Sequence, residues 1–273
     1  MTIFPLEYLS VARFHGADAG NFLQNQLSAD IAALAPGDAG FACCCTPKGQ
    51  VIGLLLVCRQ DNDFLVAGAA GLLPGILTRL KMFVFRAKVE FLAEPDMQVY
   101  GVISALQPCR PAEFQPAGLN LRYRFSAPED LQESPGETFE TGENFKAAEI
   151  SRGVVWLAAE TSEKFIPQML GFEQIGAVSF SKGCYPGQEI VARARYLGKV
   201  KRKPLVVRTL EPCPVKPAGR VELLRDETWI QGVVIDVAAA EDGSILFIVA
   251  PGEPETRTVE LKFEERRYRC ATT

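Results

Sequence analysis

A short turn rich in glycine and proline constrains the fold of this chain more than any other feature. Before it, residues 177–180 alternate apolar and polar side chains, which predicts a short strand. After it, residues 188–195 resemble the first turns of a helix. Gly183 and Gly187 allow the connecting backbone to take positive φ or to approach a ligand closely. Pro186 suits a turn or a first helical turn. The sequence therefore predicts a strand, a tight turn and a helix.

Cys184 lies inside this turn, where free backbone N–H groups and the positive end of the helix dipole would face it. Lys182, Arg193 and Arg195 add positive potential, and these effects favour thiolate over thiol. Cys184 is therefore a candidate reactive or ligand-contacting thiol, and Glu189 is a candidate acceptor for the N–H groups of a ligand. The alternative is structural, because a lone cysteine is often a small core residue and such a turn is often only a turn.

Composition sets the broad class. The chain has 273 residues, of which 48% are hydrophobic, so it can bury a large core and form two or three domains. The formal net charge of −4 gives no global argument for nucleic-acid or membrane binding. Residues 1–7 have no basic region and no long apolar run, so we expect no signal peptide, no membrane span or membrane partner, and a cytoplasmic location.

The cysteines and the histidine argue against several kinds of site. The chain has 8 cysteines and a single histidine, His15, and no two cysteines form a C-x-x-C pair. We therefore expect no metal site built by this chain alone, and no disulfides in this compartment. Residues 43–45 are all cysteine, but in a strand they would alternate between faces, which indicates packing. A cysteine–histidine dyad would need His15 beside Cys184, and we do not expect it.

The first half of the chain predicts strands and two helices. A helix is expected to begin near Asp18, with an apolar stripe at Leu23, Leu27, Ile31 and Leu34. Residues 41–45 and 51–59, joined by a turn, read as a β-hairpin. Further strands are expected at 9–14, 64–67, 88–92 and 99–104, and helices at 71–86 and 145–152.

The second half changes character twice. Residues 107–142 contain repeated prolines and many acids, which predicts an exposed, loop-rich segment. Residues 193–203 contain six cations and no acid, which is typical either of an anionic-ligand or RNA contact or of a solvated basic surface. From residue 204 the pattern is strand and turn, as in a small β-barrel or sandwich.

Residues 182–193, reading Lys-Gly-Cys-Tyr-Pro-Gly-Gln-Glu-Ile-Val-Ala-Arg, resemble the signature of the YgfZ-type folate-binding proteins. These proteins are relatives of the glycine-cleavage aminomethyltransferase, the T-protein. Other segments that resemble the family are 18–30, 45–51 and 80–89. The resemblance runs from about residue 8 to residue 203 and is weaker beyond.

The resemblance implies an α+β fold with a T-protein-like, folate-binding core and a small C-terminal β-barrel. The core would span 1–203 and consist of two interleaved α+β subdomains, and the β-barrel would span 204–273. The first subdomain would comprise about 1–45 and 145–203, and the second about 46–144. A central funnel would hold tetrahydrofolate or a one-carbon derivative.

The resemblance also implies roles for the residues of the turn and helix. Glu189 matches the carboxylate that hydrogen-bonds the pterin ring, a role that suits an acceptor of adjacent N–H groups. The expected folate-binding set is Glu189, Lys182, Tyr185, Gln188, Arg193 and Arg195. Cys184 distinguishes the YgfZ type from the T-protein and would be the functional thiol. Family members support iron–sulfur enzymes, including ones that modify tRNA, so client or assembly proteins of that kind are the expected partners.

One departure bears on activity. The T-protein has a catalytic aspartate in its hairpin, but residues 48–53 of this chain contain no carboxylate, and the next acid is Asp61. A group that handles a proton at the folate nitrogen is thus missing. Three hypotheses remain open: a folate-binding factor for iron–sulfur enzymes, a folate-dependent aminomethyltransferase, and an RNA-binding or interaction module. The basic residues 193–203 would contact tRNA in the last, or the polyglutamate tail of folate in the first.

Overall fold

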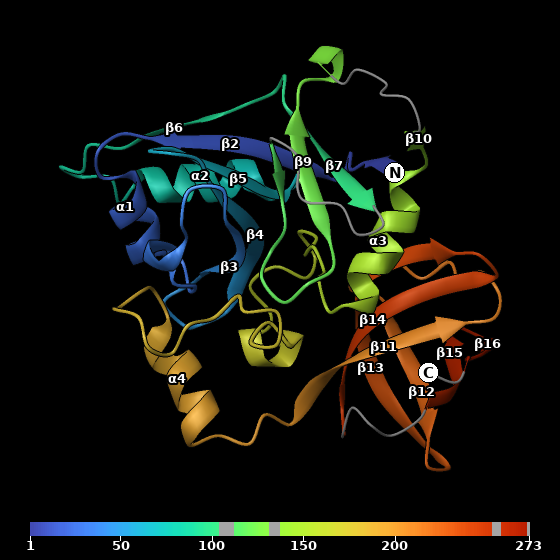
Figure 1. Ribbon diagram of the computed structural model, residues 1–273. Helices are drawn as coiled ribbons and strands as arrows, with labels where there is room; N and C mark the ends of the chain where they lie inside the picture. Colours follow the sequence, from blue (N-terminus) through green and yellow to red (C-terminus); the bar gives the residue numbers. More distant parts are fainter. Residues whose placement is uncertain (104–111, 131–136, 253–257, 272–273) are drawn as a thin grey trace.

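The computed structural model describes residues 1–103, 112–130, 137–252 and 258–271 (Figure 1). These residues form three sheets, of five, five and six strands. One large apolar core contains side chains from all three sheets and from the irregular segment 154–178. Two smaller cores lie on the other sides of the first and the third sheet.

The first sheet carries the hairpin that was expected from the sequence. Its strand order is β3-β4-β5-β2-β6, and all of its neighbouring strands are antiparallel. The strands are β2 (Leu9–His15), β3 (Ala39–Cys45), β4 (Val51–Arg59), β5 (Phe64–Ala69) and β6 (Glu90–Ala93). Helices α1 (Ala19–Gln26) and α2 (Leu73–Lys81) pack on one face, and the other face enters the large core.

The second sheet has the order β10-β1-β7-β9-β8. Its strands are β1 (Thr2–Pro5), β7 (Gln98–Ile103), β8 (Glu113–Phe114), β9 (Arg122–Ser126) and β10 (Thr138–Phe139). Helix α3 (Gly142–Ser151) follows it and packs against the third sheet, as Figure 1 shows at the right of the molecule. Short 3₁₀ turns lie at η1 (Ile31–Ala33), η2 (Pro128–Asp130) and η3 (Pro167–Leu170).

The third sheet forms the C-terminal part, after helix α4 (Gln188–Tyr196). Its order is β11-β14-β13-β12-β15-β16. The strands are β11 (Arg202–Thr209), β12 (Arg220–Arg225), β13 (Thr228–Ala240), β14 (Gly243–Pro251), β15 (Thr258–Phe263) and β16 (Arg266–Arg269). The sheet curls around its own core, but the chain near β11 and β16 meets in a single bridge between Thr209 and Cys270. The expected small β unit is present, and its sheet is not closed by a continuous ladder.

The expected α+β class is confirmed. The domain division stays a prediction, and its expected boundary between residues 45 and 46 falls inside a β-hairpin. A cut between residues 45 and 46 would separate β3 from β4, which pair along most of their length.

Three expectations about individual segments were wrong. Helix α1 ends at Gln26, so Leu27 and Ile31 continue the apolar stripe in a β-bridge and in η1. Residues 177–180 form no strand, because Ser179 donates its backbone N–H to the carbonyl of Ser28 in place of a ladder. The helix expected at 71–86 ends at Lys81.

The proline-rich segment 107–142 is more ordered than expected where the structure describes it. It contains β8, β9 and β10, and Arg124 forms ion pairs with Glu113 at 2.6 Å and Glu137 at 3.7 Å. Both carboxylates are buried, so this part of the acidic run is not a solvated surface. Residues 104–111 and 131–136, with Cys109 and Glu133, lie outside the described residues.

The cysteine run behaves as the period of a strand requires. Cys43 and Cys45 point into the large core, and Cys44 points into the core under α1 and α2. The prediction that the run serves packing is confirmed for the direction of its side chains. Among the described residues, no three histidine, cysteine, aspartate or glutamate side chains are grouped to hold a metal.

A buried carboxylate ties α3 to its surroundings. Glu149 is fully buried and accepts hydrogen bonds from Tyr8 Oη at 2.7 Å, Tyr123 Oη at 2.8 Å and Trp156 Nε1 at 3.1 Å. Burial raises the pKa of Glu149 to about 7, although the three donors oppose that shift. Nearby, Lys146 Nζ pairs with Asp236 at 2.8 Å and joins α3 to β13.

We expect this carboxyl group to make stability depend on pH. The folded pKa is above the ordinary value of 4.5, so the native state binds more protons than the unfolded state between 4.5 and about 7. The stabilising contribution is complete below 4.5 and is lost as the pH rises through about 7. Urea unfolding of wild type and Glu149→Gln across this range checks it. The wild type should lose more stability on going to high pH, and equal slopes would contradict the assignment.

Candidate functional site

The glycine-rich turn lies against the β3–β4 hairpin. Gly187 has a φ of 83° and precedes the first residue of α4, as its sequence position predicted. A Cβ on Gly187 would lie 2.4 Å from the carbonyl oxygen of Thr46 and 2.7 Å from Cα of Gly49. Only glycine permits this approach of two backbones. Gly183 has open space around it, so neither φ nor packing requires glycine there.

Lys182 anchors the turn to the end of α1. Its ammonium donates to the backbone carbonyls of Gln24, Leu27 and Ala29, at 2.7 Å for Leu27 and 3.0 Å for Ala29. These carbonyls lie at and just beyond the C-terminal end of α1, where helix carbonyls lack intrahelical partners. Burial lowers the pKa of Lys182 to about 8, and Asp30 opposes that shift. In this structure Lys182 faces the interior and anchors the turn, and its expected role in folate binding stays a prediction.

Tyr185 is the second inward anchor. Its ring is buried and lies 5.4 Å from the Lys182 ammonium. Its hydroxyl is shielded from solvent and has no hydrogen-bond partner among the described residues. Burial, reinforced by the nearby Cys45 and Cys43, raises the pKa of Tyr185. Like Lys182, Tyr185 faces the protein interior.

Cys184 projects between these two anchors to the outside. It is the exposed cysteine of the described residues, where Cys270 is half-buried and the other five are buried. Burial raises the pKa of Cys44 to about 12 and also raises that of Cys58. The buried thiols are therefore disfavoured as nucleophiles by both access and ionisation.

We expect iodoacetamide at neutral pH to alkylate Cys184 at least about tenfold faster than the other described cysteines, because the thiolate must be both formed and accessible. Mass spectrometry of timed digests measures each rate. A Cys184→Ser variant should lose the fast phase and keep the slow ones. Equal rates at Cys184 and at a core cysteine such as Cys58 would refute the expectation.

The outward residues of α4 form ion pairs. Glu189 has a side chain that is 80% exposed and pairs with Arg193 at 3.0 Å, one helical turn away. Arg195 pairs with Glu173 at 2.8 Å, and its guanidinium lies 4.2 Å from the centre of the Phe180 ring. Gln188 is half-buried at the start of the helix. The expected set is thus divided, with Lys182 and Tyr185 inside and Glu189, Arg193 and Arg195 facing solvent.

A cavity of about 430 Å³ lies beside the turn. Three separate parts of the chain line it: 29–41 before and in β3, Pro116 and Ala117, and 175–181 before the turn. Its walls are mostly apolar, with Asp30, Ser179 and Ser181 as polar side chains. The volume is within the range of about 300–1,000 Å³ that small-molecule sites occupy. Glu189 does not line it.

The hairpin has a neighbour that the sequence did not indicate. Glu163 donates its backbone N–H to the carbonyl of Val51, and Val51 donates to the carbonyl of Phe165, both at 2.8 Å. Glu163 has a φ of 57° and is exposed. It brings a carboxylate beside a hairpin that has none in residues 48–53. More than a hundred positions separate it from the hairpin, so no local pattern could have revealed it.

Comparisons place these features among known proteins. No family model matches the chain. An uncharacterized protein of Haemophilus influenzae is 31% identical over 231 residues, which are 84% of this chain and 81% of that protein. The tRNA-modifying protein YgfZ of Enterobacter sp. is 28% identical over 274 residues, covering 90% of this chain and 84% of that protein. The YgfZ protein of Escherichia coli is 27% identical, with the same coverage.

A solved structure shows the same fold. The glycine cleavage system aminomethyltransferase T from Bartonella henselae superposes with a TM-score of 0.73 at 14% sequence identity. The match covers 99% of this chain and 84% of that one. The expected T-protein-like fold is confirmed. In the part of this chain that the structure describes, no helix is both long and apolar enough to cross a membrane.

Proposed function

This chain belongs to the family of the tRNA-modifying protein YgfZ, and from that premise we propose that it binds tetrahydrofolate or a one-carbon derivative in support of enzymes that modify tRNA. The finer part of the proposal is that those client enzymes contain iron–sulfur clusters and that the protein assists their assembly or repair. The partners would then be the clients or assembly proteins, met in the cytoplasm.

The observation that carries this proposal is the close packing of the glycine-rich turn against the hairpin. The approach of Gly187 to Thr46 and Gly49 and the burial of Lys182 hold the turn in place. Cys184 and Glu189 are then presented to solvent from a fixed backbone. A rigid support of this kind suits a site that orients a ligand.

The residues present fit a reduced pterin. The Glu189 carboxylate can accept two adjacent N–H groups once it releases Arg193, and an exposed pair of that kind is worth little. The cavity beside the turn is of small-molecule size, but Glu189 does not line it, so the fit rests on the exposed carboxylate and the fixed turn. Bound folate would supply a one-carbon group or a redox-active ring, and this chain would bind and orient it.

The hairpin weighs against the aminomethyltransferase alternative. Residues 48–53 supply no carboxylate to handle a proton at the folate nitrogen. Glu163 lies beside the hairpin, but its backbone reaches that position through a separate segment. We therefore favour a role in binding over glycine-cleavage chemistry. Turnover of a methylene donor by the purified protein would reverse that preference.

Calorimetric titration with tetrahydrofolate tests the proposal. Wild type should bind, and Glu189→Ala should weaken binding by roughly tenfold or more, because a bidentate charged acceptor is lost. Glu241→Ala, at an exposed carboxylate in the turn between β13 and β14, is the matched control and should leave binding unchanged. Absence of binding to the wild type would refute the folate proposal.

A second function, contact with RNA, is favoured by the surface that follows α4. Tyr196 and Leu197 are 66% and 84% exposed, and Tyr196 meets Phe180 edge-on at 6.1 Å. Lys199, Lys201 and Arg202 are exposed, and their side chains form no ion pair with the described residues. An exposed ring beside unpaired cations is a usual platform for bases and phosphates.

If this surface binds tRNA, binding should weaken steeply with salt, and a triple variant of Lys199, Lys201 and Arg202 to glutamine should reduce the salt slope by about 2 to 3. Fluorescence anisotropy with labelled tRNA measures it. The control is Lys164→Gln with Lys216→Gln, at two exposed lysines. Lys146 is left unchanged because it forms an ion pair with Asp236. No binding at low salt would end this alternative and leave the polyglutamate tail as the ligand of these cations.

A further inference from the structure

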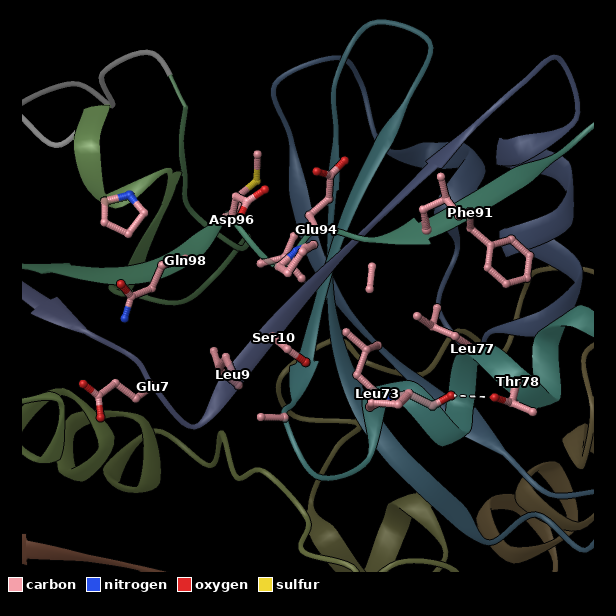
Figure 2. Close-up of a pocket in the computed structure, with 18 of the residues that line it drawn as sticks. Glu7, Leu9, Ser10, Leu73, Leu77, Thr78, Phe91, Glu94, Asp96 and Gln98 are labelled. Carbon is pink, nitrogen blue, oxygen red and sulfur yellow. Dashed lines mark hydrogen bonds between the residues drawn. The ribbon is translucent and has the colours of Figure 1, made fainter.

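Figure 2 shows a second and larger cavity, of about 800 Å³, that shares no residue with the glycine-rich turn or with α4. It lies between β2, the outer edge of α2 and the turn that leads from β6 to β7. It is also separate from the cavity beside the turn, since no residue lines both.

The cavity exists because β6 is short. Strand β6 ends at Ala93, opposite Ala12, and Pro95 follows, which cannot donate to a ladder. Strand β2 begins three residues before Ala12; the carbonyl of Val11 still accepts from the N–H of Glu94 at 2.9 Å, and Leu9 and Ser10 extend beyond that last bond. Small side chains, Ser10, Ala70 and Ala93, line the space that results.

One end of the cavity is apolar. Leu73 and Leu77 present the buried face of α2, and Phe91 closes the wall from β6. In Figure 2 these three side chains lie to the right of Ser10, with Phe91 above it and Leu73 below it. Thr78 donates its hydroxyl to the carbonyl of Pro74 at 2.9 Å, so it adds no free donor to this wall. Such a wall suits a ring or a short hydrocarbon chain.

The other end is acidic. Glu7, Asp96 and Glu129 line the cavity, and none of them forms an ion pair or side-chain hydrogen bond with the described residues. Glu94 also lines it but pairs with Arg13 at 2.7 Å. Among the described residues that line the cavity, Lys81 is the one cation. Three unpaired carboxylates against one ammonium favour a positively charged ligand group at this end.

Between the two ends lies a polar atom without a partner. Ser10 Oγ is shielded from solvent and makes no hydrogen bond to the described residues. A buried hydroxyl left unpaired costs free energy, and native structures satisfy nearly all such groups. Ser10 lines the cavity, and because its Oγ is turned away from solvent, a ligand there pairs with it only after the side chain changes rotamer.

We propose that this cavity binds a small amphipathic cation, with an apolar body along Leu73, Leu77 and Phe91 and an ammonium group toward Glu7 and Asp96. The inference stands apart from the folate proposal, because it uses none of the residues of the glycine-rich turn. It predicts a selectivity in which head-group charge decides affinity and the apolar body alone is insufficient.

Three naphthalene derivatives test the selectivity, since naphthylmethylamine, naphthylmethanol and naphthoate share one ring system and differ in charge. Ligand-observed nuclear magnetic resonance with the full chain measures each affinity. We expect the amine to bind roughly tenfold more tightly than the carboxylate, with the alcohol between them, because the carboxylates at the mouth are partly screened. Failure of the amine to bind at millimolar concentration, or equal binding of all three, would overturn the proposal.

Variants locate the binding. Glu7→Gln with Asp96→Asn should remove most of the preference for the amine and leave the affinity for the alcohol unchanged. Ser10→Leu should fill the cavity and abolish binding of all three probes. Ser10→Leu can also disturb the sheet. If that variant unfolds, the result of Glu7→Gln with Asp96→Asn decides whether the probes bind in this cavity. Glu241→Gln, an exposed acid elsewhere, should change nothing, and loss of selectivity in that variant would show that the effect is not local.

Discussion

Lys182→Met is expected to lower the free energy of unfolding by about 3 to 5 kcal/mol, because three backbone carbonyls would lose their donor in a buried setting. Methionine preserves most of the apolar stem, so the loss reports the ammonium rather than the packing. The carbonyls of Gln24, Leu27 and Ala29 have few alternatives, since they lie where α1 ends and the chain turns toward η1. Urea unfolding followed by circular dichroism measures the change.

Lys164→Met is the matched control, because Lys164 is exposed and lies on the segment that borders the hairpin. It should change stability by no more than about 0.5 kcal/mol. If Lys182→Met were as mild as that control, the ammonium would not be the anchor that its three contacts indicate. The folate and thiol assays on the Lys182 variant would then separate a structural role from a ligand contact.

Gly187→Ala is expected to have the second-largest effect, about 2 to 4 kcal/mol, and to displace the turn from the hairpin. Two costs add at this position. A side chain is strained at a φ of 83°, and its Cβ would collide with the carbonyl of Thr46 at 2.4 Å and with Gly49 at 2.7 Å. All of these are backbone atoms, so no flexible side chain can move aside to relieve the contact.

Gly176→Ala separates the two costs. Gly176 also has a positive φ, of 72°, but a Cβ there would meet nothing within 4 Å. That variant should show only the conformational cost of roughly 1 kcal/mol. Thermal unfolding of both variants, with alkylation of Cys184 as a reporter of the turn, gives the comparison. Equal destabilisation would mean that the approach of the turn to the hairpin is not what requires glycine at 187.

The predictions for Lys182 and Gly187 both concern how the glycine-rich turn is held in place. Gly187 allows the turn to pack against the hairpin, and the Lys182 ammonium hydrogen-bonds the turn to the end of α1. Between these attachments Cys184 faces solvent, and Glu189 follows on the first turn of α4. A change at either attachment should therefore alter thiol reactivity and ligand affinity together, without touching either functional group.

Much of the local structure could be predicted from the sequence. The hairpin of β3 and β4, the start of α4 at Gln188 and the opposed directions of Cys43 and Cys44 follow from alternation and turn chemistry within a few residues. The first helix was predicted to continue through Leu27 and Ile31, but it ends earlier. The same apolar spacing is satisfied by a β-bridge at Leu27 and a 3₁₀ turn at Ile31, because β3 lies alongside. Periodicity reports which side chains are buried, not which backbone partner they find.

The sequence by itself determined the signature turn, its exposed thiol and carboxylate as candidates, and the absence of a carboxylate in the hairpin, since these are properties of neighbouring residues. Only the tertiary structure decided that Lys182 and Tyr185 are anchors turned inward while Glu189 and Arg193 face outward. It alone brought Glu163 beside Val51 and formed the acidic cavity beside the first residues of β2, where β6 has ended. The physical reason is that burial and partner choice depend on segments far apart in the chain, whose contacts no local pattern encodes.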